Sequence, residues 1–422
     1  MADKRVLLLQ GPMGPFFWRL RQDLQAAGAT VRKINFCGGD ELFYPRDAVR
    51  FAGASSEWPQ FLERTLHAEQ IDAVMLFGDC RPYHLAAAKV AGAAGVAVYA
   101  FEEGYLRPDF VTVERGGCNN RSSLPRNPNV YRRFTPTAEL RQKPQRVRHV
   151  FRWATVYASL YCVAMAMLRR RYPHYRHHRS LRPWHEIESW TKAAARKLLF
   201  RWQQRGVLAH LSQAQAGNYY LVPLQVQGDA QICVHSRFAS VAEFIETVVA
   251  SFAAHAPKQR LLVIKHHPLD RGYSDYRQLI AKLAARHGLG QRLLYVHDLH
   301  LPLLLRRACG TVVINSTVGL SSVHHGTPVC ALGETPYQMP GLTYQGSLDA
   351  FWGDPGKPDA ALYRKFRAWL RHHNQANGNF YTRLTGVPTA TGIRWPALYS
   401  GLDATSHEAQ SSDEPERVSA AV

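Results

Sequence analysis

Cysteine is scarce in this 422-residue sequence, and its placement excludes two kinds of covalent or metal cross-linking. The seven cysteines are far apart, odd in number and never form a Cys-x-x-Cys pair. A disulfide framework needs paired cysteines and a structural zinc site needs clustered ones, so neither is expected. The pattern suits the reducing cytosol. The positions are Cys37, Cys80, Cys118, Cys162, Cys233, Cys309 and Cys330.

Long hydrophobic runs are also lacking. The longest uncharged apolar stretch covers residues 153–168, which is sixteen residues. A helix that crosses a bilayer needs about 20 apolar residues, so this stretch is short for a membrane span. The first residues lead directly into an apolar run at 5–10, and no signal peptide is expected.

Acidic residues are rare in one segment. The chain has 52 Lys and Arg against 32 Asp and Glu, a net charge of +20. Residues 126–205 hold 19 basic and 3 acidic residues, a local excess of +16, so the remainder is close to neutral. A localised basic block indicates an anionic partner, either a nucleic acid or an acidic membrane surface.

The apolar stretch inside this basic block favours the membrane. An apolar helix with cationic ends lies in the interface of an anionic membrane more readily than it spans one. Arginine with aromatic residues also suits RNA, but a nucleic-acid groove requires charges interspersed among the apolar residues. A buried helical hairpin with a basic outer face is the remaining alternative. The expected membrane residues are Trp153, Tyr157, Arg169, Arg170 and Arg171.

Short apolar runs alternate with amphipathic stretches in two parts of the chain, which indicates βαβ units with a parallel sheet in each. We expect an α/β protein of GT-B architecture, with two Rossmann-like doubly wound domains facing a cleft and a basic helical insertion. Many glycosyltransferases and some epimerases share this fold, so fold alone does not choose a function. The expected divisions are a first domain at 1–125, the insertion at 126–215, a second domain at 216–403 and a disordered tail at 404–422.

Two adjacent carboxylates stand where the strand at 96–101 is expected to end. Glu102 and Glu103 are followed by Gly104, which lets the chain turn, and then by Arg107. A carboxyl pair at a strand end is a candidate general acid or base. Arg107 either tunes their pKa values or holds a substrate carboxylate. A solvated acidic turn is the alternative.

The strand at 261–265 is expected to deliver Lys265, His266 and His267 to the carboxyl end of the second sheet. In an open parallel sheet, ligands bind in the crevice beyond these ends. Lysine and histidine neutralise a leaving phosphate, and histidine can also protonate it. A zinc site is disfavoured because no Cys or acidic residue stands at ligand spacing.

A hydroxyl-rich turn follows the strand at 311–314. Asn315, Ser316 and Thr317 begin a helix, and free N–H groups at a helix start favour anions. A helix cap without a ligand is the alternative. Glu334 lies in a loop placed to contact a base or ribose. The chain has no Asp-x-Asp motif, so we expect no metal ion and a donor held by side chains and helix ends.

Gln225 and Asp229 follow the strand at 219–223, where the two domains are expected to meet. Asp229 is a candidate nucleophile or base. A turn aspartate or a helix cap is the more common role for such a residue.

Taken in order, these clusters resemble the capsule polysaccharide synthesis family of Gram-negative bacteria, of the KpsS/LipB type. The resemblance runs over roughly residues 5–400, and several motifs in order are far more specific than any one. The matching pieces are Gln10 to Phe17, Gly38 to Asp40, Glu102 to Asp109, Tyr172 to Arg179, Pro223 to Gln231, His266 to Pro268 and Asn315 to Gly319.

This resemblance implies a retaining β-Kdo glycosyltransferase that moves Kdo from CMP-Kdo to a (lyso)phosphatidylglycerol acceptor and so starts the lipid linker of a capsule polysaccharide. From this resemblance together with the basic segment and the lack of an Asp-x-Asp motif, we expect a peripheral enzyme at the cytoplasmic face of the inner membrane, with an anionic phospholipid as acceptor, no cofactor and no nucleic acid partner. A companion Kdo transferase and the capsule export machinery are further expected partners.

The resemblance also implies roles for single residues. Glu102 or Glu103 would do acid–base work, and Asp229 would be the nucleophile, by likeness to retaining Kdo transferases. Two carboxylates in one cleft are what retention by double displacement requires. Acceptor or sugar contacts are expected from Gly11, Gly14 and Arg107, and donor contacts from Lys265, His266, His267, Asn315, Ser316, Thr317, Gln225 and Glu334.

Two rival functions remain open. A polyol-phosphate transferase with a CDP-linked donor would use the same fold, transfer phosphate and release CMP. A non-catalytic, basic subunit of a capsule assembly complex is the other.

Overall fold

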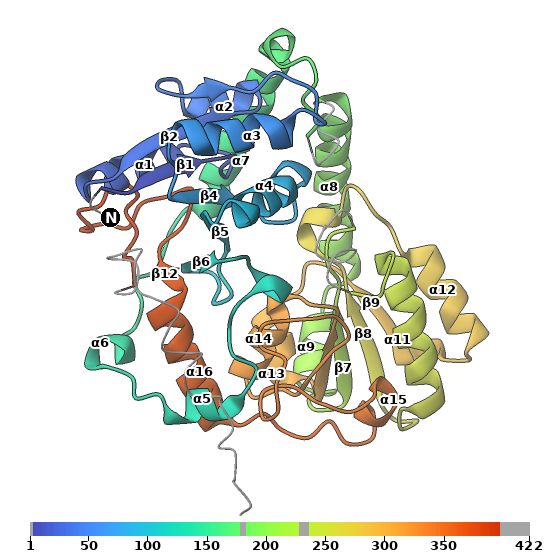
Figure 1. Ribbon diagram of the computed structural model, residues 1–422. Coiled ribbons are helices and arrows are strands. Elements are labelled where there is room, and N and C mark those ends of the chain that lie inside the picture. Colours follow the sequence, from blue (N-terminus) through green and yellow to red (C-terminus); the bar gives the residue numbers. More distant parts are fainter. Residues whose placement is uncertain (1–2, 178–182, 228–235, 397–422) are drawn as a thin grey trace, which may run out of the picture.

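A computed structural model describes residues 3–177, 183–227 and 236–396. Two α/β domains lie beside each other, each built on a mainly parallel sheet with helices packed against it (Figure 1). This is the two-domain, Rossmann-like GT-B architecture that the alternation of strands and helices predicts. Because both sheets present the carboxyl ends of parallel strands, each contributes loops to the space between the domains.

The first sheet has seven strands in the order β12-β6-β5-β4-β1-β2-β3. Strands β1 to β5 pair in parallel, whereas β6 and β12 add an antiparallel edge. The central strands are nearly continuous aliphatic runs because both of their faces are covered. The strands are β1 (Arg5–Leu8), β2 (Thr30–Asn35), β3 (Val49–Arg50), β4 (Ala73–Phe77), β5 (Ala97–Glu103), β6 (Phe110–Arg115) and β12 (Gln375–Asn377).

Separate hydrophobic cores cover the two faces of this sheet. Phe16 and Phe17 belong to one core, and Trp58 and Leu62 belong to the other. The helices of this domain are α1 (Phe16–Ala26), α2 (Gly38–Phe43), α3 (Trp58–Ala68), α4 (Pro82–Ala93) and the 3-10 turn η1 (Asn119–Arg121).

The second sheet has five parallel strands in the order β11-β10-β7-β8-β9. Its strands are β7 (Tyr219–Pro223), β8 (Leu261–Lys265), β9 (Leu293–Val296), β10 (Gly310–Val313) and β11 (Val329–Ala331). The helices are α11 (Val241–His255), α12 (Arg277–Arg286), α13 (Leu301–Arg307), α14 (Thr317–His324) and α15 (Leu348–Phe351), with 3-10 turns η3 (Pro268–Asp270) and η4 (Gly290–Arg292). The strands β7, β8 and β10 agree with the runs expected at 219–223, 261–265 and 311–314.

The chain returns to the first domain after completing the second. Helix α16 (Ala360–His373) leads into β12, which pairs antiparallel with β6. Phe380 then joins the core of the first domain, with its ring edge against Phe16 at 4.8 Å between centroids. The expected second domain at 216–403 is therefore wrong at its end. A three-residue strand carries too little pattern to reveal which sheet it joins.

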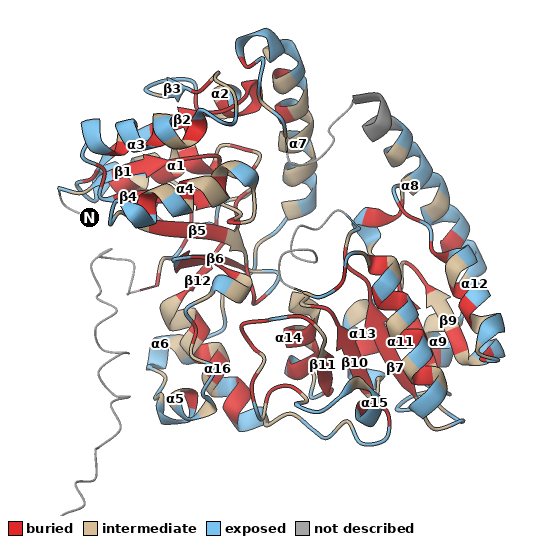
Figure 2. Cartoon of the chain, turned by 45° about the vertical axis from the view of Figure 1, so that its right-hand side comes forward, coloured by how far each residue is buried: buried red, intermediate tan, exposed pale blue. Residues whose placement is uncertain are grey.

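The segment expected as one basic insertion, 126–215, is divided among three places. Its first helices pack against α16, α7 packs against α2, and α8 and α9 lie against the second domain. Figure 2 shows α7 beside the first domain and α8 over the second, with much of both helices exposed. The elements are α5 (Pro128–Arg133), α6 (Ala138–Arg141), α7 (Val150–Met167), η2 (Arg169–Arg171), α8 (Pro183–Gln203) and α9 (Val207–Ser212).

Candidate active site between the domains

Strand β5 ends in the two carboxylates. Glu102 and Glu103 are its last residues, and Gly104 begins the turn towards β6. A Cβ atom at Gly104 would lie 2.2 Å from the carbonyl oxygen of Phe110, so only glycine permits this close approach. Glu102 Oε1 accepts the backbone N–H of Glu103 at 3.0 Å. The turn thus fixes both acids at the sheet edge that faces the second domain.

Burial changes the acidity of both carboxyls. It raises the pKa of Glu102 to about 7, with a smaller contribution from the charge of Glu103. Burial also raises the pKa of Glu103, although the charge of Arg107 opposes the shift. A carboxyl that titrates near neutral pH can donate or accept a proton during a reaction. Glu102 therefore fits acid–base work, as the sequence predicts for one of the pair.

Arg107 connects the acids with the second domain. Its Nε donates to the carbonyl oxygen of Gly104 at 3.3 Å. Its positive charge opposes the rise in the pKa of Glu103. For His267, the charge of Arg107 is the third cause of the lowered pKa, after burial and the charge of Lys265. Both effects require the guanidinium to lie within electrostatic reach of both groups. Arg107 is therefore close to both the acidic and the cationic cluster.

His267 is held with one ring nitrogen available to a ligand. Its Nδ1 accepts the N–H of Leu269 at 3.2 Å, so the neutral ring carries its proton on Nε2. Burial and the charge of Lys265 lower the pKa of His267 to about 4. At neutral pH this side chain is an N–H donor to an anion. The lowered pKa favours the predicted binding role over the predicted protonation of a leaving group.

Lys265 ends β8 and is only 5% exposed. Burial lowers its pKa to about 8, and the charge of Asp298 acts in the opposite direction. Asp298 is itself paired with Arg271. With a pKa near 8, Lys265 keeps most of its positive charge at pH 7 and supplies the cleft with a cation beside His267.

His266 lies behind this pair and not in the cleft. It is 3% exposed, and its Nδ1 is 2.6 Å from the Tyr295 hydroxyl. Its ring packs against His297, with centroids 5.3 Å apart. Burial lowers its pKa to about 4. The structure gives His266 a supporting position, in place of the donor contact that the sequence predicts.

An amide pair ties the turn after β10 to the end of β7. Gln225 Nε2 donates to Asn315 Oδ1 at 2.9 Å, and the Asn315 N–H donates to Gln225 Oε1 at 3.3 Å. Ser316 caps α14 by accepting the N–H of Val318 at 3.2 Å, and Thr317 is the first residue of the helix. The predicted cap is confirmed. Anion binding at this turn stays a prediction.

The remaining predicted residues have other surroundings. Glu334 is exposed after β11, and Asp229 lies outside the described residues. A Cβ at Gly11 would lie 2.8 Å from the Phe17 ring, and one at Gly14 would lie 3.0 Å from the Tyr157 ring. Packing alone requires both glycines, so their contact with a sugar stays a prediction.

Among the described residues, no group of three or more potential ligands is arranged to hold a metal ion.

Arg81 is a site residue that the sequence reasoning misses. Its guanidinium donates to Gln10 Oε1 at 2.9 Å. A Cβ at Gly78 would lie 3.3 Å from Arg81 Nε and 3.9 Å from Glu102 Oε2, so both side chains border the same glycine. Arg81 is thus a second cation beside the acids. Its place after β4, the neighbour of β5, is the signal that would have found it.

Helix α7 supports the acidic side of the cleft from behind. The buried Tyr161 hydroxyl donates to Asp40 Oδ1 at 2.9 Å and accepts from Gln10 Nε2 at 3.0 Å. It also lies 2.9 Å from Cys37 Sγ. Because Gln10 holds Arg81, a chain of hydrogen bonds runs from α7 to the neighbour of Glu102.

Residues in and just after α8 support the cationic cluster, Lys265 and His267, in the same way. Phe200 stacks on His297 with ring centroids 3.5 Å apart. Gln204 Nε2 is 3.0 Å from His297 Nδ1, and the Gln204 side chain also accepts the His297 N–H at 2.9 Å. His297 packs on His266, which precedes His267. The two long helices therefore each stabilise one half of the site.

Comparison with known proteins places this architecture in a family. The sequence matches the family model described as "Capsule polysaccharide biosynthesis protein" over residues 72–381. It is 43% identical over 386 residues to the capsule polysaccharide export protein KpsS of Escherichia coli, covering 90% of this chain and 98% of that protein. It is 39% identical over 389 residues to the capsule polysaccharide modification protein LipB of Neisseria meningitidis serogroup A, covering 91% and 93%.

A solved structure, the β-Kdo 2,7 transferase of Thermosulfurimonas dismutans KpsC, aligns with a TM-score of 0.41 and 15% identity over 87% of this chain and 89% of that chain. The sequence relationships carry more weight, because the family model and both relatives cover most of the chain. The expectation drawn from the ordered motifs is confirmed at this level. The chain belongs to the capsule polysaccharide biosynthesis family.

Proposed function

We propose that the protein is a retaining glycosyltransferase that moves β-Kdo from CMP-Kdo to a (lyso)phosphatidylglycerol acceptor. The observation that carries the proposal is the position of Arg107, whose charge acts on Glu103 of one domain and on His267 of the other. Family membership supports a role in capsule synthesis. The names of the relatives, which describe capsule polysaccharide export and modification, agree with this role.

The cationic half suits the departure of CMP. Lys265 supplies a positive charge and the His267 Nε2–H supplies a hydrogen bond, so both stabilise the negative charge that develops on the leaving phosphate. Thr317 and the N-terminus of α14 follow β10, which lies two strands from β8 in the same sheet, and the helix dipole there also favours an anion. Neutralisation by fixed groups explains how CMP would leave without a metal ion.

The acidic half suits activation of the acceptor. Glu102, with a pKa near 7, takes the proton of an attacking hydroxyl at neutral pH. Retention requires a second carboxylate as nucleophile, and we assign this role to Asp229 because of its place after β7 and its motif. Glu103 and Arg107 set the electrostatic field around Glu102.

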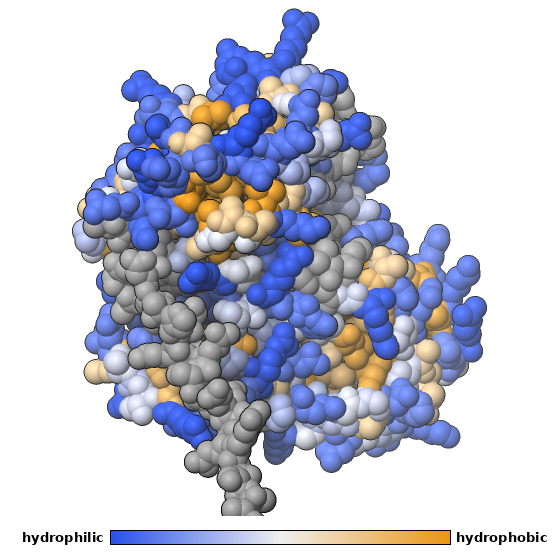
Figure 3. Space-filling model, viewed as in Figure 1, coloured by the Kyte–Doolittle hydropathy of each residue, from blue (hydrophilic) through white to orange (hydrophobic). Residues whose placement is uncertain are grey.

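The surface of α7 supports a peripheral location on the inner membrane, facing the cytoplasm. Five apolar side chains at spacings of three and four lie on one helix face and are 39–78% exposed. In Figure 3, hydrophilic residues dominate the visible surface and hydrophobic ones gather in patches. A continuous apolar face on an exposed helix marks an interaction surface. The five are Trp153, Val156, Leu160, Val163 and Met167.

Length and composition alone do not distinguish a span from a surface helix. Among the described residues, α7 is the one helix long and apolar enough to cross a membrane. Its opposite face, however, is committed to the protein, because Tyr161 and Ala164 are buried against α2. A helix bound along one side to a folded domain lies in the interface, where η2 adds three arginines for anionic headgroups. The same lipid surface holds the proposed acceptor.

The test is a transfer assay with purified protein, CMP-Kdo and fluorescent lyso-phosphatidylglycerol, read by mass spectrometry. A mass gain of one or more Kdo units supports the proposal. A product formed only from CDP-polyol donors would establish the phosphotransferase instead. If no donor is consumed and Glu102→Gln leaves capsule formation in cells intact, the protein is a non-catalytic assembly subunit.

A further inference from the structure

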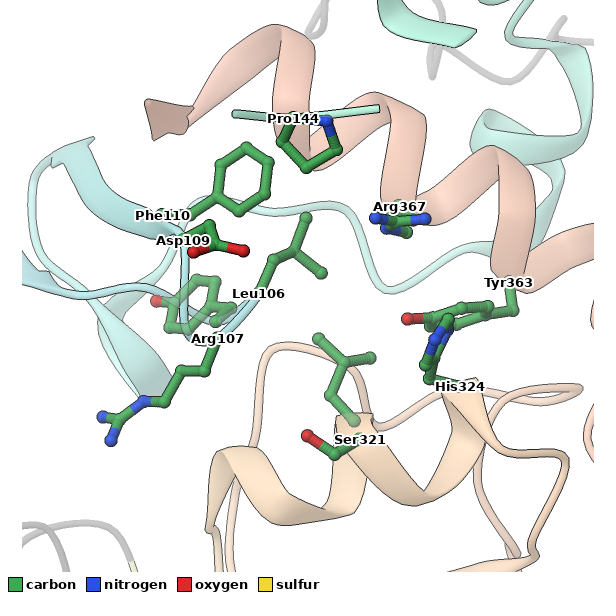
Figure 4. A pocket seen from close by; sticks show the side chains of 11 residues that line it. Leu106, Arg107, Asp109, Phe110, Pro144, Ser321, His324, Tyr363 and Arg367 are labelled. Atoms are coloured by element: carbon green, nitrogen blue, oxygen red, sulfur yellow. The ribbon is translucent and has the colours of Figure 1, made fainter. Parts of the chain in front are cut away.

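A hollow between the domains lies beside Arg107 and takes no part in the roles assigned above. It has a volume of about 100 Å³, with walls from the turn at 105–110, α14 and α16 (Figure 4). One water molecule needs only about 10–15 Å³ by this measure, so the hollow admits a group of several non-hydrogen atoms. Because both domains line it, a ligand bound there would touch both.

Polar groups from the two helices gather on one wall of the hollow. Arg367 and Tyr363 come from α16 and His324 from α14, and Figure 4 shows the three close together. The Tyr363 hydroxyl points towards the open space. Burial and the charge of Arg367 lower the pKa of His324, so its ring is neutral near pH 7. The wall thus offers one fixed positive charge and two neutral hydrogen-bonding groups.

The charge of Arg367 is not neutralised by the acid that also lines the hollow. Asp109 lies on the opposite side in Figure 4. Its Oδ1 accepts the N–H of Val147 at 2.9 Å, which engages it elsewhere. Within the described part of the chain, Arg367 has no hydrogen bond or ion pair. A half-buried guanidinium without a carboxylate loses hydration that a bound anion would replace.

We propose that this hollow is a subsite for an anionic group, a phosphate or a carboxylate, bound by Arg367 with Tyr363 and His324. The inference rests on the proposed function in one respect, which is that the group belongs to a substrate. Arg107 lines the hollow and also acts on His267, so a group bound here is adjacent to the cleft. We assign the group to the phosphate of a glycerophospholipid acceptor. The carboxylate of the sugar is the other source.

Calorimetric titration of the purified full chain distinguishes these sources. The probes are sn-glycerol 3-phosphate, free Kdo and CMP. We expect Arg367→Met to weaken glycerol 3-phosphate binding at least tenfold and Tyr363→Phe to weaken it several-fold. The matched control is Arg364→Met, which removes the same charge from the exposed face of α16. CMP binding should be unchanged in all three variants, and melting temperatures report that they fold.

Glycerol 3-phosphate that fails to bind the wild-type chain, or binds Arg367→Met and wild type equally, overturns the acceptor assignment. If free Kdo alone depends on Arg367, the anion subsite stands and its occupant is the sugar carboxylate. If neither probe depends on Arg367, there is no subsite. If CMP binds neither the wild type nor any variant, the donor site of the proposed function is refuted. The titration with glycerol 3-phosphate still decides whether the subsite exists.

Discussion

At the ends of β5 and β8, the same physical effect acts on groups of opposite charge. Burial raises the pKa of Glu102 to about 7 and lowers that of Lys265 to about 8. Removing water disfavours whichever form is charged, so acids become weaker and bases become less basic. Both groups are thereby brought towards neutral pH, where a small change in surroundings shifts a proton. Such clusters are typical of functional sites.

Glu102→Gln is expected to reduce transfer by about 10²–10⁴-fold, because it removes the proposed acid–base group. The same change tests the pKa shift. A carboxyl raised from an ordinary pKa of 4.5 to about 7 stabilises the fold fully below the lower value and loses that contribution as pH rises through about 7. The variant should therefore exceed wild type in unfolding free energy at pH 8 by about 1–3 kcal/mol, but not at pH 5.

Urea unfolding at both pH values measures this difference. Glu63→Gln, at an exposed position of α3, is the control and should show none. An unfolding free energy of Glu102→Gln that follows wild type at every pH would contradict the raised pKa.

CMP affinity is expected to decline as pH rises from 7 to 9, because Lys265 loses its proton as pH passes about 8. Lys265→Met should weaken binding at pH 7 about tenfold, as expected for loss of a charged hydrogen bond, and should abolish the decline. His267→Ala should weaken binding equally across this range, since its pKa near 4 leaves it neutral throughout. Calorimetry measures all three, with Lys282→Met as a surface control. A decline that survives in Lys265→Met would assign it to another group.

At the scale of elements, the two long helices each have one face packed on a domain and exposed apolar side chains on another face. Gly38 and Gly39 permit the close approach of α7, since a Cβ at Gly38 would lie 2.2 Å from the Ala164 carbonyl oxygen. Trp190 and Trp202 on the α8 segment are 49% and 65% exposed, while Phe200 is buried. The exposed side chains and the buried side chains that support the site, Tyr161 and Phe200, thus belong to the same two helices.

Tyr161→Phe is expected to lower the free energy of unfolding by about 1–3 kcal/mol, because it removes a hydroxyl that hydrogen-bonds with several buried polar groups at once. These groups are Asp40, Gln10 and Cys37. Chemical denaturation measures the loss. Tyr157→Phe, a hydroxyl deletion on the same helix, should cost less, and equal losses would mean that the buried network contributes nothing specific.

Replacing Val156, Leu160 and Val163 together with serine is expected to release the protein from vesicles that contain phosphatidylglycerol. Burying each of these side chains in lipid is worth about 1.5–3 kcal/mol, so the partition coefficient should fall at least tenfold. Co-sedimentation measures the bound fraction. Leu269→Ser removes an apolar side chain that is 62% exposed elsewhere and should have no effect. Unchanged binding of the triple variant would refute the membrane role of α7.

At the scale of the whole molecule, α16 and β12 bind the two domains into one unit. The chain crosses from the first domain to the second through α8 and α9 and crosses back through α16. One hydrophobic core contains Phe110 of the first domain, Leu320 of α14 in the second domain and Phe366 of α16. The chain therefore passes between the two domains twice. These two connections limit how far the domain with the acids can move from the domain with the cations.

A chain that ends at residue 374 is expected to be insoluble, because it lacks β12 and the aromatic cover of the first sheet. Phe380 would no longer cover Phe16 and Phe77, whose rings it meets at 4.8 and 5.0 Å. A chain that ends at residue 396 keeps every contact described above and should remain soluble with an unchanged melting temperature. Equal solubility of the two truncations would show that the returning segment is dispensable.

The sequence by itself determined the features that local chemistry sets. Aliphatic runs place the strands, Gly104 marks the turn after the acids, and Ser316 caps its helix because a hydroxyl accepts the free N–H groups there. Ordered motifs were enough to predict the family and the strand ends that carry Glu102, Lys265 and His267. These features depend on short segments of sequence, so they do not depend on which other segments those segments pack against.

Only the tertiary structure decided which segments meet. It assigned β12 to the first sheet, divided the basic segment between two domains, placed Arg81 beside Glu102 and moved His266 behind His267. Each depends on contacts between residues far apart in sequence, where packing and hydrogen bonding select one partner among many with similar local patterns. Burial, which sets the pKa values of the site, is likewise a property of the assembled fold.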